Sequence, residues 1–312
     1  MKLVFCGTPQ FAVPTLLALI DASHEIALIL TQPDRPSGRG MQLVAPPVKQ
    51  MAEAAGLEVF QPEKIKNNQE LRERLTAIAP DAIIVVAYGR IIPKWMLDLP
   101  PLGNINLHGS LLPKYRGAAP IQWAIARGET MTGVTTMRLD EGLDTGDMLL
   151  RREVPIGPAE TAEDLYPKLS QIGAEVMIQT LEGLQARSIT PVKQDDSLAT
   201  LAPILTRDDG AINFSLTGKD VYDRWRGFQP WPGAWTTIDG KKLLVSRMLP
   251  SSARHEDGTL GEVLIAKERM WVAFGGGTWV EFVEVQLEGK KRMPSAEFLR
   301  GYPLKSGDRL GR

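Results

Sequence analysis

Two polar side chains two residues apart, Asn106 and His108, make the strongest case for chemistry in this chain. Asn106 lies within, and His108 directly follows, the short stretch Ile105 to Leu107, which is typical of a strand. Side chains two apart on a strand project from one face, and ligands of open α/β sheets bind at the carboxyl ends of strands. An amide and an imidazole at such an edge can donate hydrogen bonds to an oxyanion, the group that acyl transfer must stabilise. The alternative is a purely structural histidine, which is the better interpretation of an isolated one.

A second cluster favours the catalytic interpretation. Residues 140–147, D-E-G-L-D-T-G-D, combine glycines with carboxylates, as loops that touch ligands often do. Within this loop, Asp144 can pair with His108 if the loop meets the end of the strand. The charge of the carboxylate would then favour the protonated imidazole.

Other kinds of chemistry have less support in the composition. The single cysteine, Cys6, excludes an intrachain disulfide and cysteine-rich zinc sites, and its apolar neighbours indicate a buried, inert thiol. The histidines are too scattered for a familiar zinc spacing, so we expect no metal: His24, His108 and His255. No stretch reaches the roughly 18 apolar residues of a membrane span, and the N-terminal apolar run is too short for a signal peptide. We therefore predict a cytoplasmic protein.

Short apolar runs and helical patterns alternate through the first 155 residues. Such strands, apolar on both faces and separated by helices, predict a doubly wound α/β domain with a mostly parallel, Rossmann-like sheet. The first strand ends in Gly7-Thr8-Pro9 without the later glycines of a dinucleotide fingerprint, so a plain strand-to-helix turn is favoured there. A longer helix is predicted from Thr161, with Pro167 delaying its start or kinking it. The expected strands are Leu3–Cys6, Ile26–Leu30, Ala82–Ala87 and Ile105–Leu107, and the expected helices are Phe11–Ala22, Val48–Ala55 and Gln69–Ile78.

The composition and the hydrophobic pattern of the sequence change after residue 189. A polar, proline-flanked stretch predicts a linker over 190–207. Short alternating strands broken by glycine then predict a smaller, OB-like β-barrel over 208–312, which holds five of the seven tryptophans. The whole chain has a formal charge of −1, so a nucleic-acid partner needs a local basic patch. Residues 206–312 carry 17 basic and 14 acidic residues, which makes this part mildly basic.

Several motifs together resemble the 10-formyltetrahydrofolate-dependent formyltransferases. N-I-N-L-H-G-S-L-L-P begins at residue 104, and K-Y-R-G-A-A-P-I-Q and G-L-D-T-G-D-M-L follow it. F-x-G-T-P at 5–9, T-Q-P-D-R-P-x-G-R-G at 31–40, V-V-A-Y-G at 85–89 and F-x-P-W-P-G-A-W at 228–235 extend the similarity over most of the chain. The asparagine, histidine and distant aspartate are common to the superfamily, whereas the arginine-bearing loop and the long β tail are more specific. Cys6 departs from the small residue usual in relatives.

The resemblance implies roles for particular residues of this chain. The catalytic trio would be Asn106, His108 and Asp144. 10-Formyltetrahydrofolate would be the formyl donor, and the segment expected to touch it is Ser110, Leu111, Leu112 and Pro113. The backbone expected to cradle the pterin ring of the folate is that of Arg90, Ile91 and Ile92.

The loop Thr31–Pro47 is long for a connection between strand and helix. Its 17 residues exceed the usual two to six or so, which indicates a functional insertion. It carries Arg35 and Arg39, and Gly38 and Gly40 free Arg39 to enter a groove and contact phosphates or base edges. The resemblance makes this loop a wedge against the acceptor stem of a tRNA. The alternative is a solvated loop without a partner.

The tail offers a second set of basic residues. Lys290, Lys291 and Arg292 form a run that alone is more often a solvated turn, but on a net-positive domain it can supply phosphate contacts. Trp231 and Trp235 are the right type for stacking on bases, but are more simply explained as core residues.

The resemblance as a whole implies formyl transfer to the α-amine of methionine carried by initiator tRNA, by a protein expected to be a monomer. Catalysis would lie in residues 1–189 and tRNA binding in 208–312. One alternative is a formyltransferase for a small amine, such as a nucleotide sugar or glycinamide ribonucleotide, although the basic tail and arginine loop would then be unnecessary. Another is a Rossmann-type nucleotide-binding protein without catalysis, which the missing glycine fingerprint disfavours.

Overall fold

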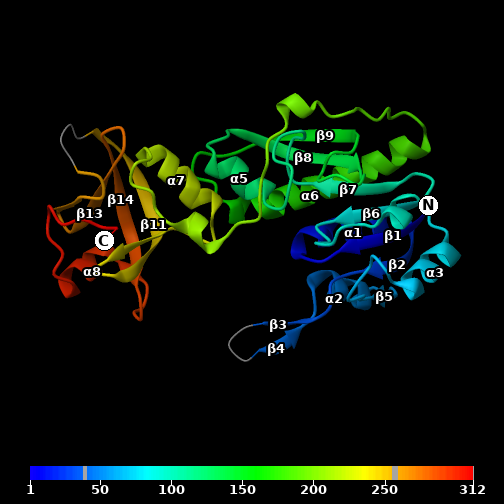
Figure 1. The fold of residues 1–312 in the computed structure, drawn as a ribbon, viewed down its shortest axis with the longest axis horizontal. Helices are drawn as coiled ribbons and strands as arrows, with labels where there is room; N and C mark the ends of the chain where they lie inside the picture. Colours follow the sequence, from blue (N-terminus) through cyan, green and yellow to red (C-terminus); the bar gives the residue numbers. More distant parts are fainter. Residues whose placement is uncertain (38–40, 255–258, 312) are drawn as a thin grey trace. The chain divides into compact units, whose positions relative to one another are not determined.

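The computed structural model describes residues 1–37, 41–254 and 259–311. They fold into two compact units (Figure 1). The first unit combines Met1–Pro120, Met131–Pro155 and Leu165–Pro203, and the second combines Ile121–Thr130, Ile156–Asp164 and Ile204–Arg312. Each unit therefore collects segments that are distant in the sequence, which a boundary placed by composition alone does not anticipate.

The first unit is built on a seven-stranded sheet with the order β5-β2-β1-β6-β7-β8-β9. The pairs from β5 to β7 are parallel, whereas β7–β8 and β8–β9 are antiparallel. Figure 1 shows these strands in succession across the unit. Their bounds are β1 Lys2–Gly7, β2 Glu25–Leu30, β5 Val59–Phe60, β6 Ala82–Val86, β7 Asn104–His108, β8 Met131–Arg138 and β9 Met148–Pro155.

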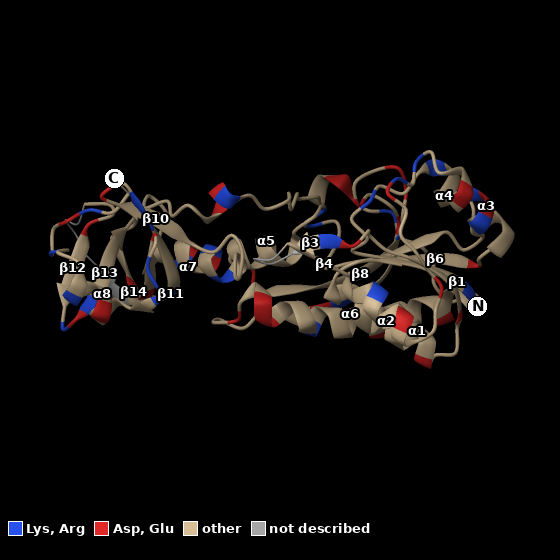
Figure 2. Ribbon diagram, turned by 90° about the horizontal axis from the view of Figure 1, so that it is seen from below, with Lys and Arg blue, Asp and Glu red and all other residues tan. Residues whose placement is uncertain are grey.

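Helices cover this sheet, as the sequence predicts for a doubly wound fold. The predicted helix at Gln69–Ile78 forms with those bounds as α3, and the Asn68 side chain caps it by accepting a hydrogen bond from the Leu71 N–H. Figure 2 shows β6 free of charged residues and α3 carrying both signs, as a buried strand and a surface helix require. The other helices up to residue 185 are η1 Gln10–Ala12, α1 Val13–Asp21, α2 Pro47–Ala54, α4 Lys94–Leu97, α5 Pro120–Ala126 and α6 Ala162–Gln185.

Two contacts illustrate how helices pack on the sheet of the first unit. Leu71 of α3 shares a buried cluster with Val4 and Cys6 of β1, and burial raises the pKa of the Cys6 thiol far above its usual range. The prediction that this thiol is buried is thereby confirmed. Helix α6 packs against β7, where a Cβ added at Gly173 would come within 2.5 Å of the Leu107 side chain. Glycine therefore permits the approach of this helix to the strand that carries Asn106 and His108.

The structure differs from the sequence predictions at three places in this unit. The insertion Thr31–Pro47 contains a two-stranded hairpin, β3 Arg35–Ser37 and β4 Gln42–Val44, rather than irregular chain alone. Strands β8 and β9 were not predicted. Helix α6 begins at Ala162, so Pro167 lies within it and does not delay its start.

The second unit contains an antiparallel sheet with the order β10-β11-β14-β13-β12, to which β15 is added beside β14. The core lies between this sheet and two helices, with Val221 of α7, Phe282 of β14 and Phe298 of α8 among its buried residues. A mostly parallel α/β unit followed by a smaller β unit was predicted, and this prediction is confirmed. The bounds are β10 Trp235–Ile238, β11 Lys241–Arg254, β12 Val263–Ala266, β13 Arg269–Phe274, β14 Thr278–Leu287, β15 Met293–Pro294, η3 Arg207–Gly210, α7 Gly218–Gly227 and α8 Ser295–Gly301.

Residues 191–203, which fall in the predicted linker, make hydrogen bonds to the first unit. Isolated bridges join Val192 to Met148 and Leu201 to Arg116, and a short helix, η2 (Asp196–Leu198), lies between these bridges. All four of these bridging residues belong to the first unit. The stretch with the composition of a linker is therefore hydrogen-bonded to the α/β unit as far as Ala202.

No helix in the described part of the chain is both long enough and apolar enough to cross a membrane.

Candidate active site

Strand β7 carries three polar residues on one face, and they differ in their partners. Asn104, Asn106 and His108 are all buried. The Asn104 amide donates to the carbonyls of Met96 and Leu97 at 2.9 and 3.1 Å, so this side chain ties β7 to α4. By contrast, Asn106 is 8% exposed and its side chain makes no hydrogen bond to the described residues, so its amide is available to donate to a ligand.

His108 lies between two protein acceptors. Its Nε2 is 2.8 Å from the Tyr115 carbonyl oxygen, and its Nδ1 is 3.6 Å from Oδ2 of Asp144. The contact with Tyr115 makes Nε2 the donor, since a carbonyl can only accept. The imidazole is thus held by the backbone on one side and faces a carboxylate on the other. The predicted meeting of the strand end and the acidic loop is present in this geometry.

Asp144 is held in an unusual backbone conformation. Its φ is +53°, in the left-handed region that non-glycine residues rarely adopt. Its Oδ2, the atom that faces His108, accepts a hydrogen bond of 2.8 Å from the Gly117 N–H. Gly117 has a φ of +122°, and a Cβ there would come within 2.6 Å of the Ala202 carbonyl oxygen. Glycine is therefore required at 117, both for its conformation and for the close approach of residue 202.

The segment Ser110–Pro113 is fixed by strands that the sequence did not predict. The Thr135 hydroxyl of β8 donates to the Ser110 carbonyl at 2.7 Å and accepts from the Leu112 N–H at 3.2 Å. Arg151 of β9 donates to the Leu112 carbonyl at 3.2 Å. The side chains of Ser110 and Leu112 are fully buried, and the Ser110 hydroxyl donates to the Lys114 carbonyl. Only Leu111 and Pro113 of this segment are half-buried and keep side-chain surface for a ligand.

The backbone after β6 is oriented by Gln32. The Gln32 Nε2 donates to the carbonyls of Tyr88 and Gly89, both at 3.1 Å, and its Oε1 accepts from Arg90 Nε at 3.0 Å. The N–H and C=O of a trans peptide point in opposite directions, so the N–H groups of Gly89 and Arg90 are directed away from Gln32. Neither has an acceptor within the described residues. Beside them Ile91 is 91% exposed, whereas Ile92 is buried.

Family models cover both units of the chain. The model described as formyl transferase matches residues 1–181, and the model described as formyl transferase, C-terminal domain, matches residues 204–303. The methionyl-tRNA formyltransferase of Acidobacterium capsulatum is 65% identical over 311 residues, which cover 100% of both chains. The methionyl-tRNA formyltransferase of Koribacter versatilis is 56% identical, with 100% of this chain and 99% of that chain covered. This chain belongs to the methionyl-tRNA formyltransferase family.

Solved structures with the same fold are more distant in sequence. An N-formyltransferase from Helicobacter canadensis, in complex with folinic acid and dTDP-3-aminofucose, superposes with a TM-score of 0.68 at 18% identity, over 90% of this chain and 98% of that one. HypX from Aquifex aeolicus, in complex with tetrahydrofolic acid, has a TM-score of 0.64 at 19% identity and covers 100% of this chain and 51% of that one. At these identities the likeness concerns the fold.

The base of the β3–β4 hairpin is fixed by a polar cluster. Gln61 Nε2 donates to the Gln32 carbonyl and to Asp34, and Lys49 pairs with Asp34 at 2.8 Å. These hydrogen bonds lower the pKa of the Asp34 carboxyl. Arg35 is exposed, with Glu63 4.0 Å away, whereas Arg39 lies outside the described residues. Gln32 thus contacts both the hairpin base and the backbone after β6.

The predicted basic residues of the tail lie between β14 and β15. Lys290, Lys291 and Arg292 are all exposed. Arg292 pairs with Glu284 at 2.9 Å, while neither lysine has a carboxylate partner in the described part of the chain. The three residues therefore lie together, and the side chains of Lys290 and Lys291 are available to bind an anion.

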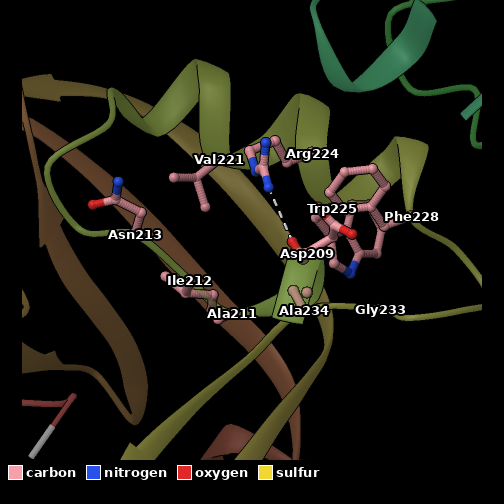
Figure 3. A pocket seen from close by; sticks show the side chains of 11 residues that line it. Asp209, Ala211, Ile212, Asn213, Val221, Arg224, Trp225, Phe228, Gly233 and Ala234 are labelled. Atoms are coloured by element: carbon pink, nitrogen blue, oxygen red, sulfur yellow. Dashed lines mark hydrogen bonds between the residues drawn. The ribbon is translucent and has the colours of Figure 1, made fainter. Parts of the chain in front are cut away.

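A small pocket lies elsewhere in the second unit, between η3 and α7 (Figure 3). Arg224 donates to the Asp209 carbonyl across it, and burial lowers the pKa of this arginine. Trp225 Nε1 is buried without a partner among the described residues. The Asp209 carboxylate already accepts from the Thr206 N–H and hydroxyl.

The sequence analysis missed several residues that hold the site together. Gln32, Arg116 and Gly117 lie inside T-Q-P-D-R-P-x-G-R-G and K-Y-R-G-A-A-P-I-Q, so their signal is membership of motifs that resemble those of the family. Thr135, Gln194 and Thr200 carry no local signal. Their roles depend on partners that are distant in the sequence, such as Ser110 for Thr135 and Asp144 for Gln194.

Proposed function

We propose that this protein transfers the formyl group of 10-formyltetrahydrofolate to the α-amine of methionine on initiator tRNA, giving N-formylmethionyl-tRNA. The observation that carries the proposal is 65% identity, over the whole chain and both units, to a relative named for this reaction. The match covers the residues to which we assign chemistry as well as those to which we assign tRNA binding.

In the proposed mechanism, Asn106, His108 and Asp144 form the catalytic trio. The amine attacks the formyl carbon, and the carbonyl oxygen becomes an oxyanion that accepts a hydrogen bond from the unpaired Asn106 amide. His108 lies beside Asn106 in the trio, with its Nε2 on the Tyr115 carbonyl and its Nδ1 facing the Asp144 carboxylate, so we assign it a pairing with Asp144 in place of the hydrogen bond to the oxyanion that the sequence suggested. The amine loses one proton and the departing folate nitrogen gains one, and we assign this transfer to Asp144, directly or through water.

We assign the folate donor to the edge formed by the segments after β6 and β7. The unpaired N–H groups of Gly89 and Arg90 suit the acceptor atoms of a pterin, and the exposed Ile91 offers an apolar contact for its ring. Leu111 and Pro113 would add contacts from the segment after β7. Distant relatives of the same fold in complex with folinic or tetrahydrofolic acid support a folate ligand here.

We assign tRNA binding to the insertion after β2 and to the second unit. Arg35 and Arg39 would contact the acceptor stem, and Lys290, Lys291 and Arg292 would contact phosphates. Their support is the exposure of the described members of this set and the absence of carboxylate partners for the two lysines in the described chain.

The experiment that tests this function offers the protein two classes of amine. It is incubated with 10-formyltetrahydrofolate and either initiator methionyl-tRNA or dTDP-3-aminofucose, with uncharged initiator tRNA as the control. We expect formyl-methionyl-tRNA and no formylated sugar. Formylation of the sugar nucleotide without formylation of methionyl-tRNA would contradict the proposal.

A further inference from the structure

The residues from Val192 to Ala202 form a second layer behind the proposed catalytic trio. The Tyr115 N–H donates to the Thr200 hydroxyl at 2.9 Å, and the Arg116 N–H donates to the Thr200 carbonyl at 2.8 Å. The Ala202 N–H in turn donates to the Arg116 carbonyl at 2.7 Å. Residues 115–117 supply the carbonyl that holds His108 and the N–H that holds Asp144, so this segment supports both contacts.

Within this segment, Gln194 contacts the loop of Asp144 directly. Its Nε2 donates to the carbonyls of Asp144 and Gly146, at 2.8 and 2.7 Å. Its Oε1 accepts from Nε and Nη2 of Arg116, at 3.0 and 2.9 Å. Gln194 is 5% exposed and Arg116 is 7% exposed. The amide is therefore buried with both ends paired.

The chemistry of these partners fixes the amide in one orientation. Arginine can only donate and carbonyls can only accept, so a flipped amide would place donor against donor and acceptor against acceptor. The bonds from Arg116 are charge-assisted and stronger than neutral ones. Arg116 thus orients Gln194, and Gln194 presents two fixed donors to the loop that carries Asp144.

The Asp144 loop needs such support because its conformation is unfavourable. A non-glycine residue with φ near +53° persists only when its surroundings hold it there. The two hydrogen bonds from Gln194 hold the carbonyls of residues 144 and 146, on the backbone side of the loop. The Gly117 N–H holds the carboxylate itself. Backbone and side chain of Asp144 are therefore fixed by different partners.

We infer that Gln194 is a positioning residue, which holds the Asp144 carboxylate against His108 through the backbone of the 144–146 loop, with Arg116 fixing its orientation. The inference rests on the proposed function, since it assigns Asp144 a part in the reaction. Gln194 itself does not touch the substrates in this assignment.

Three variants of the full-length protein test this role. Gln194→Met removes both polar ends at similar length. Gln194→Glu keeps an acceptor for Arg116 but replaces the donor with an oxygen that faces two carbonyls. Val192→Thr is the matched control, because Val192 is an exposed neighbour whose bridge to Met148 uses only the backbone.

We expect both Gln194 variants to lower kcat, by up to about 10²-fold for a misplaced catalytic group, with KM for methionyl-tRNA changed much less. Repeating Gln194→Met in an Asp144→Asn background separates positioning from general damage. If Gln194 acts through Asp144, the second substitution adds little to the first. An equal loss in both backgrounds, or no loss in either, would overturn the inference.

A measurement independent of activity distinguishes this inference from the proposed function. Amide hydrogen exchange of residues 142–147 and of Gly117 should become faster in Gln194→Met and stay unchanged in Val192→Thr. If wild-type protein fails to formylate methionyl-tRNA, the proposed function fails while the exchange experiment still reports on the loop. Unchanged exchange in Gln194→Met would refute the positioning role whatever the substrate.

Discussion

Residues near the carboxyl end of β7 and residues in the turn between β14 and β15 are both assigned to substrates, but their surroundings are opposite. Asn106, His108 and Asp144 are largely buried, with 15% of the Asp144 side chain exposed, and Asp144 is fixed by hydrogen bonds from distant segments. Lys290 and Lys291 are exposed and have no carboxylate partner in the described chain.

This difference separates two ways of using a polar group. Buried groups act at fixed positions, and a small displacement removes most of their effect on a reaction. Exposed lysines act as charges whose contribution is screened by salt and shared among neighbours. Substitutions in the first region should therefore change turnover steeply, whereas those in the second should change affinity gradually.

The largest effect is expected from Asn106→Ala. Losing one oxyanion donor typically lowers turnover by about 10² to 10³. The thermal unfolding midpoint should hardly change, because the Asn106 side chain has no partner among the described residues. Asn104→Ala is the matched control on the same strand: it removes the donor to the Met96 and Leu97 carbonyls, and leaving a buried acceptor unpaired costs about 1–3 kcal/mol of unfolding free energy. Near wild-type turnover of Asn106→Ala would remove this residue from the trio.

Arg39, which lies outside the described residues, should affect the choice of tRNA. Arginine can make a bidentate contact with guanine or phosphate, whereas lysine keeps only the charge, so Arg39→Lys should reduce discrimination between initiator and elongator methionyl-tRNA. Arg39→Ala removes the charge as well and should reduce discrimination further, by about 1–3 kcal/mol. The measurement is kcat/KM for both tRNAs at one salt concentration. Identical ratios in all three proteins would leave Arg39 without a role in recognition.

A smaller, salt-dependent effect is expected in the β14–β15 turn. Replacing Lys290 and Lys291 with alanine should reduce the slope of log affinity against log salt by roughly 1 for each phosphate that the protein no longer neutralises. Arg292→Ala should change it less, because Glu284 already pairs with this arginine. Titrations of tRNA binding at several salt concentrations provide the slopes. Equal slopes in wild type and the double variant would make the turn a solvated surface.

The smallest effect concerns alkaline stability of the second unit. Tyr302 donates to Asp239 at 2.6 Å, and this hydrogen bond raises the pKa of Tyr302 to about 12. The unfolded value is about 10, so the contribution is complete below about pH 10 and is lost as the pH rises towards about 12. Tyr302→Phe should lower the unfolding midpoint near neutral pH, and the gap to wild type should close in that alkaline window. A gap that is constant with pH would show that the phenol contributes only through packing.

The sequence was a good guide where structure follows from local pattern. Helix α3 forms with the predicted bounds because an apolar face at helical spacing and an asparagine cap are both local signals. The buried strands β1, β2, β6 and β7 also appear near their predicted positions, since runs of branched apolar residues identify them. Strands β8 and β9 were missed. The threonines of β8, such as Thr135 and Thr136, are β-branched and were a local strand signal that went unused. In β9 the charges of Arg151 and Arg152 obscure the strand pattern, and its pairing with β8 appears only in the folded structure.

By itself, the sequence determined which residue types are available for catalysis and in what order they occur along the chain. It shows an amide and an imidazole two residues apart on a strand, an aspartate in a glycine-rich loop and an arginine-bearing insertion. Only the tertiary structure decided how these groups are held. Asp144 faces His108 because Gly117 and Gln194, which are 27 and 50 residues away in the sequence, donate hydrogen bonds to it. Arg116 contributes indirectly, because it donates to Gln194. Composition alone cannot distinguish a solvated polar stretch from one whose polar groups pair with buried partners. Residues 192–202 pair with partners that are distant in the sequence, so only the folded structure shows which of the two they are.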